Sequence, residues 1–76
     1  MTPAEEAEER VGLVMRPILF ELGGLALTWG PAGAWHLREH RVRMALREVG
    51  LEAMLPEVKD RWLGARPPPP GGGYWT

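Results

Sequence analysis

The chain has 76 residues, of which 9 are Lys or Arg and 10 are Asp or Glu, and its formal net charge at pH 7 is −1. This length allows one domain at most, and the nearly balanced charge excludes a surface that is basic throughout and suited to nucleic acid. The chain contains no cysteine, which excludes disulfides and thiolate metal sites, so its small core needs a metal held by His and carboxylates, a partner or unusually good packing.

The amino-acid composition of the chain is skewed. The chain contains no Ser, Asn or Gln, and Lys59 is its only lysine. Thermolabile amides are scarce in proteins from hot environments, so we expect a thermophilic source with a GC-rich genome. The first residues are acidic where a secretory signal needs basic ones, so we expect a cytoplasmic or particle-associated protein.

A first helix is predicted from the N-terminus to residue 29. Thr2 is a good N-cap, Pro3 suits the first helical position and Glu5 lies in the first turn. Apolar residues at helical spacing form one stripe, which consists of Ala4, Val11, Met15, Ile18, Leu22, Leu25 and Trp29. Pro17 predicts a kink in this helix.

Residues 18–29 also allow a second interpretation, a β-hairpin. The apolar runs 18–22 and 25–29 flank Gly23-Gly24, a typical hairpin turn. Period-two alternation and β-branched residues are scarce in this segment, so we favour the helix.

Two shorter helices are predicted to follow. Gly30-Pro31 interrupts the chain and starts a second helix over about 31–49, which Gly50 ends in a Schellman motif with Leu51. The third helix covers 51–63 and ends at Gly64, and Pro56 either kinks it or begins its main part. The expected apolar positions of these two helices are Trp35, Val42, Ala45, Leu46 and Val49, then Leu51, Leu55, Val58 and Trp62. We expect Trp29, Trp35 and Trp62 in the core.

The C-terminal segment 66–76 differs from the rest of the chain. Four prolines favour an extended polyproline II conformation, and the three glycines that follow favour a flexible segment. Two aromatic residues stand near the end. A proline-rich segment with aromatic anchors is typical of a strap that docks on a partner. The predicted partner-binding residues are Arg66, Pro67, Pro68, Pro69, Pro70, Tyr74 and Trp75.

The second helix carries a basic face. His36, His40, Arg43 and Arg47 recur at helical spacing and are candidate contacts for phosphate or carboxylate groups. His36-Leu37-Arg38-Glu39-His40 also matches the inverted zinc-protease pattern. That family needs a further glutamate ligand and a much larger body, so we assign no metal, cofactor or catalytic residue.

Two alternatives in other functional classes remain open. The helices on either side of Gly50 could form a helix-turn-helix that binds nucleic acid through the basic face, although Glu57 and Asp60 oppose this. Residues 17–35 contain one charged residue, Glu21, and could span or line a membrane as part of a small membrane-complex subunit.

The predicted fold is all-α: a kinked long N-terminal helix, two shorter helices and an extended Pro/Gly-rich tail. A small helical domain occupies residues 1–65 and the tail residues 66–76. The favoured function is that of a non-enzymatic subunit or adaptor of a larger assembly, such as a virion or another particle. Its partners would be proteins, in a homo- or hetero-oligomer, bound through apolar helix faces and the tail.

Overall fold

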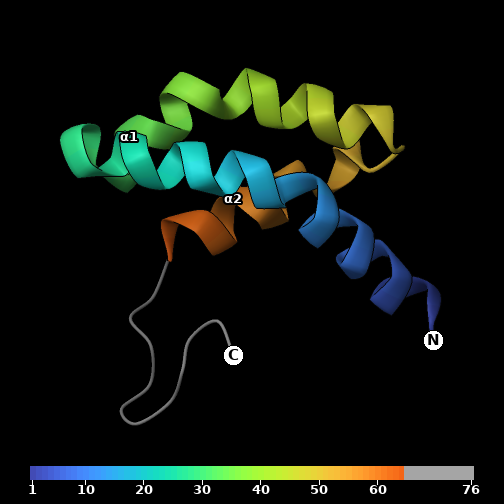
Figure 1. The fold of residues 1–76 in the computed structure, drawn as a ribbon. Helices are drawn as coiled ribbons and strands as arrows, with labels where there is room; N and C mark the ends of the chain where they lie inside the picture. The colour runs from blue at the N-terminus through green and yellow to red at the C-terminus, as the bar shows by residue number, and fades with distance from the viewer. Residues whose placement is uncertain (65–76) are drawn as a thin grey trace, which may run out of the picture.

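In a computed structural model, which describes residues 1–64, the chain is all-helical (Figure 1). The elements are α1 (Pro3–Glu48), a 3-10 turn (Glu52–Met54) and α2 (Leu55–Leu63). Residues 1–64 contain no strand, so the all-α prediction is confirmed and the hairpin interpretation of residues 18–29 is wrong. The predicted tail and its boundary at residue 66 lie outside the described residues.

α1 turns back on itself at Gly30 and forms two antiparallel arms, visible in Figure 1 as the blue-to-teal and green-to-yellow segments. We call residues 3–29 the first arm and residues 31–48 the second arm. Gly30 has φ 76° and ψ 167°, a conformation essentially confined to glycine. Pro31, which has no N–H to donate, then begins the second arm. The predicted interruption at Gly30-Pro31 is confirmed, and one residue makes the whole turn.

The first arm begins with the predicted cap. The Glu5 amide donates to Thr2 Oγ1 at 3.2 Å, and the Glu5 carboxylate accepts from the Thr2 amide at 3.2 Å, which completes a capping box. These hydrogen bonds from Thr2, first from its backbone and then from its hydroxyl, lower the pKa of Glu5. Backbone angles stay helical through Pro17, and Figure 1 shows the first turns of the arm, in blue, inclined to the remainder.

The ends of the second arm and of α2 follow the glycine signals. The Leu51 amide donates to the Leu46 carbonyl at 2.8 Å and the Gly50 amide to the Arg47 carbonyl at 3.0 Å, the two bonds of a Schellman motif. Pro56 stands in the first turn of α2 and so begins that helix instead of kinking it. Gly64 ends α2 with φ 57°.

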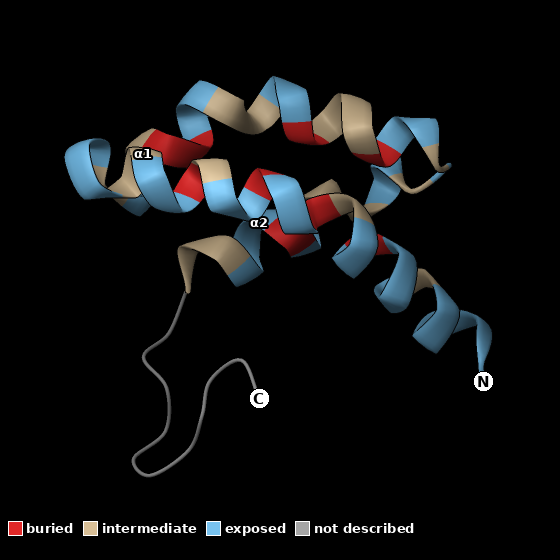
Figure 2. Cartoon of the chain, in the orientation of Figure 1, coloured by how far each residue is buried: buried red, intermediate tan, exposed pale blue. Residues whose placement is uncertain are grey.

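The core lies between the two arms and α2, on the inner faces coloured red in Figure 2. Its buried members are Val11, Met15, Ile18, Leu22, Ala34, Trp35, Val42, Leu46 and Val58. Most of the predicted apolar stripes therefore face inward. Trp29 does not, because it stands at the tip of the turn with 62 % of its surface exposed, so its predicted place in the core is wrong.

Hydrogen bonds fix both ends of this arrangement. At the open end of the hairpin, the Arg10 guanidinium donates to the Val49 carbonyl at 2.7 Å. At the closed end, the Trp62 indole donates to the Pro31 carbonyl at 2.8 Å, so the last turn of α2 lies beside the turn of α1. The two arms and α2 are thus held together as one unit.

Candidate protein-docking surface

The first arm carries a second row of large apolar side chains on the side opposite the core. Leu13, Phe20 and Leu27 follow one another at intervals of seven residues, which places them on one line along a helix. Their exposed fractions are 59 %, 88 % and 90 %. We call these three residues the outer stripe. Large apolar side chains gathered in this way mark interaction surfaces more often than single exposed ones do.

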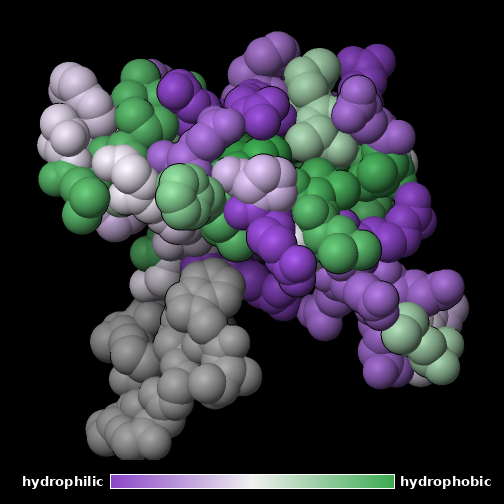
Figure 3. Space-filling view, in the orientation of Figure 1, coloured by the Kyte–Doolittle hydropathy of each residue, from purple (hydrophilic) through white to green (hydrophobic). Residues whose placement is uncertain are grey.

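Two apolar rows on one helix make the first arm unusually hydrophobic. An 18-residue window of α1 has a mean hydropathy of 1.5, yet only 22 % of that window is buried. Figure 3 shows the result as green apolar surface that reaches solvent among purple polar side chains. By length and composition α1 could cross a membrane, a test that the core helix of a soluble protein and a signal sequence also pass.

Glycines flatten the helix surface next to the outer stripe. A Cβ atom added at Gly12, Gly23 or Gly24 would meet no atom within 4 Å outside the local helix. Gly23 and Gly24 follow Phe20 by one turn, so open space adjoins its exposed ring. Small residues of this kind let the backbone of another helix approach closely.

Glu21, which follows Phe20 in the sequence, is paired within the hairpin. Its carboxylate lies 3.2 Å from Nε of Arg41 and 3.5 Å from Nε of Arg38, both on the second arm. The pairing turns the carboxylate toward the second arm and leaves the stripe free of that charge. These pairs are partly exposed, so each contributes little to stability.

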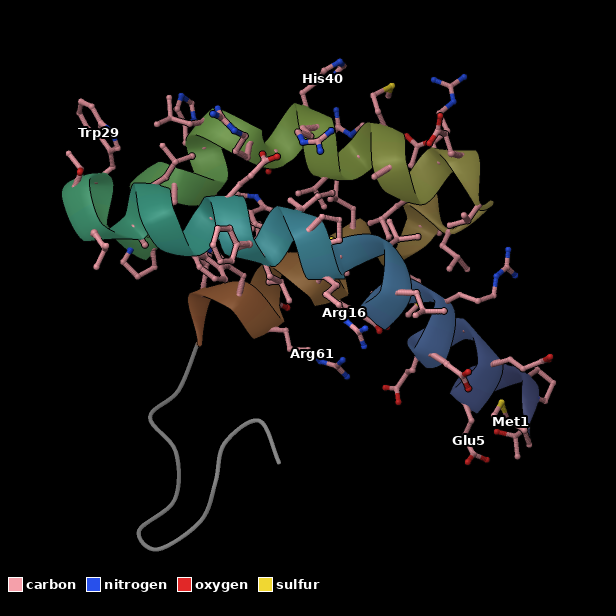
Figure 4. The ribbon with its side chains drawn as sticks, in the orientation of Figure 1. Met1, Glu5, Arg16, Trp29, His40 and Arg61 are labelled. Atoms are coloured by element: carbon pink, nitrogen blue, oxygen red, sulfur yellow. The ribbon has the colours of Figure 1, made fainter. Side chains whose placement is uncertain are left out.

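The predicted basic face lies along the second arm. His36, His40 and Arg47 are exposed and Arg43 is partly buried, and Figure 4 shows His40 pointing outward from this arm. Arg47 lies 3.8 Å from the Glu52 carboxylate, and Arg43 lines a shallow open hollow with residues of the following turn. The four side chains share one arm, but nothing in their geometry converges on one point.

Glu39, the glutamate of the zinc-protease pattern, makes structural contacts. The Glu39 carboxylate accepts a hydrogen bond from the Trp35 indole at 2.7 Å and lies 3.9 Å from Nζ of Lys59 on α2. Glu39 therefore joins the second arm to α2. Residues 1–64 contain no group of three or more potential ligands that could hold a metal ion.

The predicted partner-binding residues of the tail, from Arg66 to Trp75, lie outside the described residues. The outer stripe itself was missed by sequence reasoning, which followed a single apolar row along the first arm. The signal was present as the regular seven-residue spacing of Leu13, Phe20 and Leu27. What the sequence could not show is which of the two rows faces the second arm.

Comparison with known proteins gives no relative from which to infer a function: no family model, curated protein or solved structure matches the chain.

Proposed function

We propose that the chain is a non-enzymatic helical subunit or adaptor of a larger protein assembly, and that it docks through the outer stripe. The observation that supports this is the exposure of Phe20 and Leu27, at 88 % and 90 %, on the face opposite a complete core. Burying one such side chain gains about 1.5–3 kcal/mol. A partner that covers the stripe would therefore stabilise both itself and this chain. The predicted tail, residues 66–76, would supply a second contact.

A protein partner is favoured over a membrane because of what lies beside the first arm. The second arm packs along it and carries Arg38, Arg41, Arg43 and Arg47, which a spanning hairpin would draw into lipid at high cost. The first arm could also lie flat on the surface of an anionic membrane. This is opposed by repulsion from the four glutamates at its start, Glu5, Glu6, Glu8 and Glu9. Membrane insertion therefore ranks second.

Nucleic-acid binding ranks third. Three of the four arginines of the second arm, Arg38, Arg41 and Arg47, lie within ion-pair distance of carboxylates. A phosphate backbone would have to compete with these carboxylates, and α2 adds the exposed acids Glu57 and Asp60. The idea of a particle component from a thermophilic source rests on the size of the chain, its predicted tail and its composition.

The test is differential capture by the tagged full-length chain from a detergent-free lysate of its source. The bait is wild type, the double variant Phe20→Glu with Leu27→Glu, or the control Leu37→Glu. Leu37 is half-exposed on the second arm, so this control adds the same charge away from the stripe. We expect mass spectrometry to find a stoichiometric partner, which includes the chain itself, with wild type and control but not with the double variant.

Equal capture by all three baits would contradict docking through the stripe. A wild-type chain that stays in the membrane pellet until detergent is added, while the double variant is released by buffer alone, would establish the membrane alternative instead. Circular dichroism of each bait shows whether its helices remain folded.

A further inference from the structure

We propose that the outer stripe pairs with the same stripe of a second copy of this chain, in a two-fold arrangement with antiparallel first arms that cross at Phe20. This inference rests on the proposed function and names the partner. It is carried by the spacing of the stripe, the shape beside it and the distribution of charge along the first arm.

The spacing makes the stripe self-complementary. Leu13 and Leu27 stand seven residues before and after Phe20, so an antiparallel copy centred on Phe20 places each Leu13 opposite the partner's Leu27. A two-fold interface requires this property, because one patch must match itself after rotation. The stripe runs over 15 residues of helix, from Leu13 to Leu27, and is about 21 Å long at a rise of 1.5 Å per residue.

The shape beside the stripe fits the same arrangement. In the antiparallel register, Arg16 and Pro17 of one copy face Gly24 and Gly23 of the other. A Cβ at either glycine would meet no atom within 4 Å, so the open space above these glycines has room for the aliphatic stem of Arg16 and the pyrrolidine ring of Pro17. Phe20 then lies against Phe20 at the centre, where two exposed rings can stack.

Charge selects the antiparallel direction. A parallel pair would also match the stripe with itself, but it would bring together the two copies of Glu5, Glu6, Glu8 and Glu9. In the antiparallel pair, each acidic segment lies toward the closed end of the partner's hairpin. Residues 22–35 carry no Asp, Glu, Lys or Arg, so the acidic segment meets no like charge there. The antiparallel pair therefore avoids the repulsion that the parallel pair would create.

The size of the contact predicts weak, reversible pairing. One stripe about 21 Å long on a helix about 10 Å wide is small beside the roughly 800 Å² that each partner buries in a standard stable interface. We expect a monomer–dimer equilibrium that shifts with concentration.

The first experiment is sedimentation equilibrium of the full-length chain without detergent, from about 1 µM to about 1 mM, where weak pairing titrates. We expect the mass to rise toward twice the 8.5 kDa of the chain. Phe20→Glu should remain monomeric throughout, whereas the control Leu37→Glu should follow the wild type. A monomer at every concentration, or a dimer that Phe20→Glu leaves intact, would overturn the proposal. The capture experiment would still test whether the stripe docks on another protein. Self-pairing and docking on another protein can therefore be contradicted independently.

The second experiment tests whether the paired first arms are antiparallel. The chain has no natural cysteine, so an introduced cysteine is the only one that can form a disulfide. Under mild oxidation, a mixture of Leu13→Cys and Leu27→Cys chains should form mixed disulfide dimers, and Phe20→Cys should crosslink with itself. Leu13→Cys alone should stay uncrosslinked at the same concentration. Efficient homodimers of Leu13→Cys together with few mixed dimers would establish the parallel arrangement and contradict the proposal.

Discussion

At the scale of single residues, the Glu5 carboxylate links the first turn of α1 to pH. Thr2 donates to it from its amide at 3.2 Å and from its hydroxyl at 2.9 Å, and both bonds favour the charged form. Because the pKa of Glu5 is lowered on folding, its stabilising effect is present above the ordinary glutamate pKa of about 4.3. It is lost as the pH falls through the lowered value, so the first turn should fray in acid.

Thr2→Ala removes the hydroxyl but keeps the amide of residue 2. We expect the pKa of Glu5 to rise part of the way toward its ordinary value, because one of the two donors remains. NMR titration of the Glu5 side-chain carboxyl measures this directly. Thr28→Ala, at an exposed threonine elsewhere on the first arm, is the control and should leave the titration of Glu5 unchanged.

Leu22 shows how much of the stability can depend on one core residue. Its side chain is completely buried between the arms. Leu22→Ala should cost about 2–5 kcal/mol through lost burial and a residual cavity. A domain of this size has about 3–10 kcal/mol in total, so urea denaturation should show a greatly lowered midpoint. Leu37→Ala makes the same change at a half-exposed site and should cost far less; equal losses would contradict the observed burial.

At the scale of elements, the hairpin depends on its one-residue turn. A side chain at Gly30 is strained by φ 76° whatever space surrounds it. Gly30→Ala should therefore lower the melting temperature, by several degrees for a cost of about 1–3 kcal/mol.

Gly12→Ala is the matched control for that change. Gly12 lies inside the first arm with open space around it, so alanine should raise the melting temperature slightly through its better helix propensity. Opposite shifts of melting temperature in the two variants, measured by circular dichroism, would establish that the turn needs a glycine at residue 30. Shifts of the same sign would contradict this explanation.

Much of the helix layout could be predicted because its signals are local. Thr2-Pro3, Gly30-Pro31 and the Schellman glycine at residue 50 each act on the backbone next to them. Trp29 was misplaced for the opposite reason. Its helical spacing matched the buried row, but the chain reverses at the next residue, so its side chain stands at the tip of the hairpin with most of its surface exposed. Periodicity alone does not show where the neighbouring arm ends.

At the scale of the whole molecule, the outer stripe could have been noticed in the sequence but not oriented. Both apolar rows of the first arm have helical spacing, and only the packing of the second arm and α2 decides that Ile18 and Leu22 face inward while Phe20 faces out. The pairing of Glu21 with Arg38 and Arg41 was hidden for the same reason, since it joins residues of different arms.

Self-association gives the whole molecule a measurable thermal signature. If folded copies pair and unfolded ones do not, mass action makes the melting temperature rise with protein concentration. We expect this rise for the wild type in scanning calorimetry between micromolar and millimolar chain. The melting temperature of Phe20→Glu should be independent of concentration, and a wild type with the same independence would contradict the pairing.

The Gly30-Pro31 turn also bears on how copies of this chain remain separate molecules. Without the turn, the 46 residues of α1 could form one helix about 69 Å long, and two such chains could exchange arms and build each core from both. Pro31 opposes that domain swap, because within a continuous helix its ring would clash with the Leu27 carbonyl. Replacing both residues with alanine should therefore favour long intertwined dimers. Gly30 permits the closed hairpin and Pro31 disfavours the single continuous helix, so the second arm of each chain packs on its own first arm.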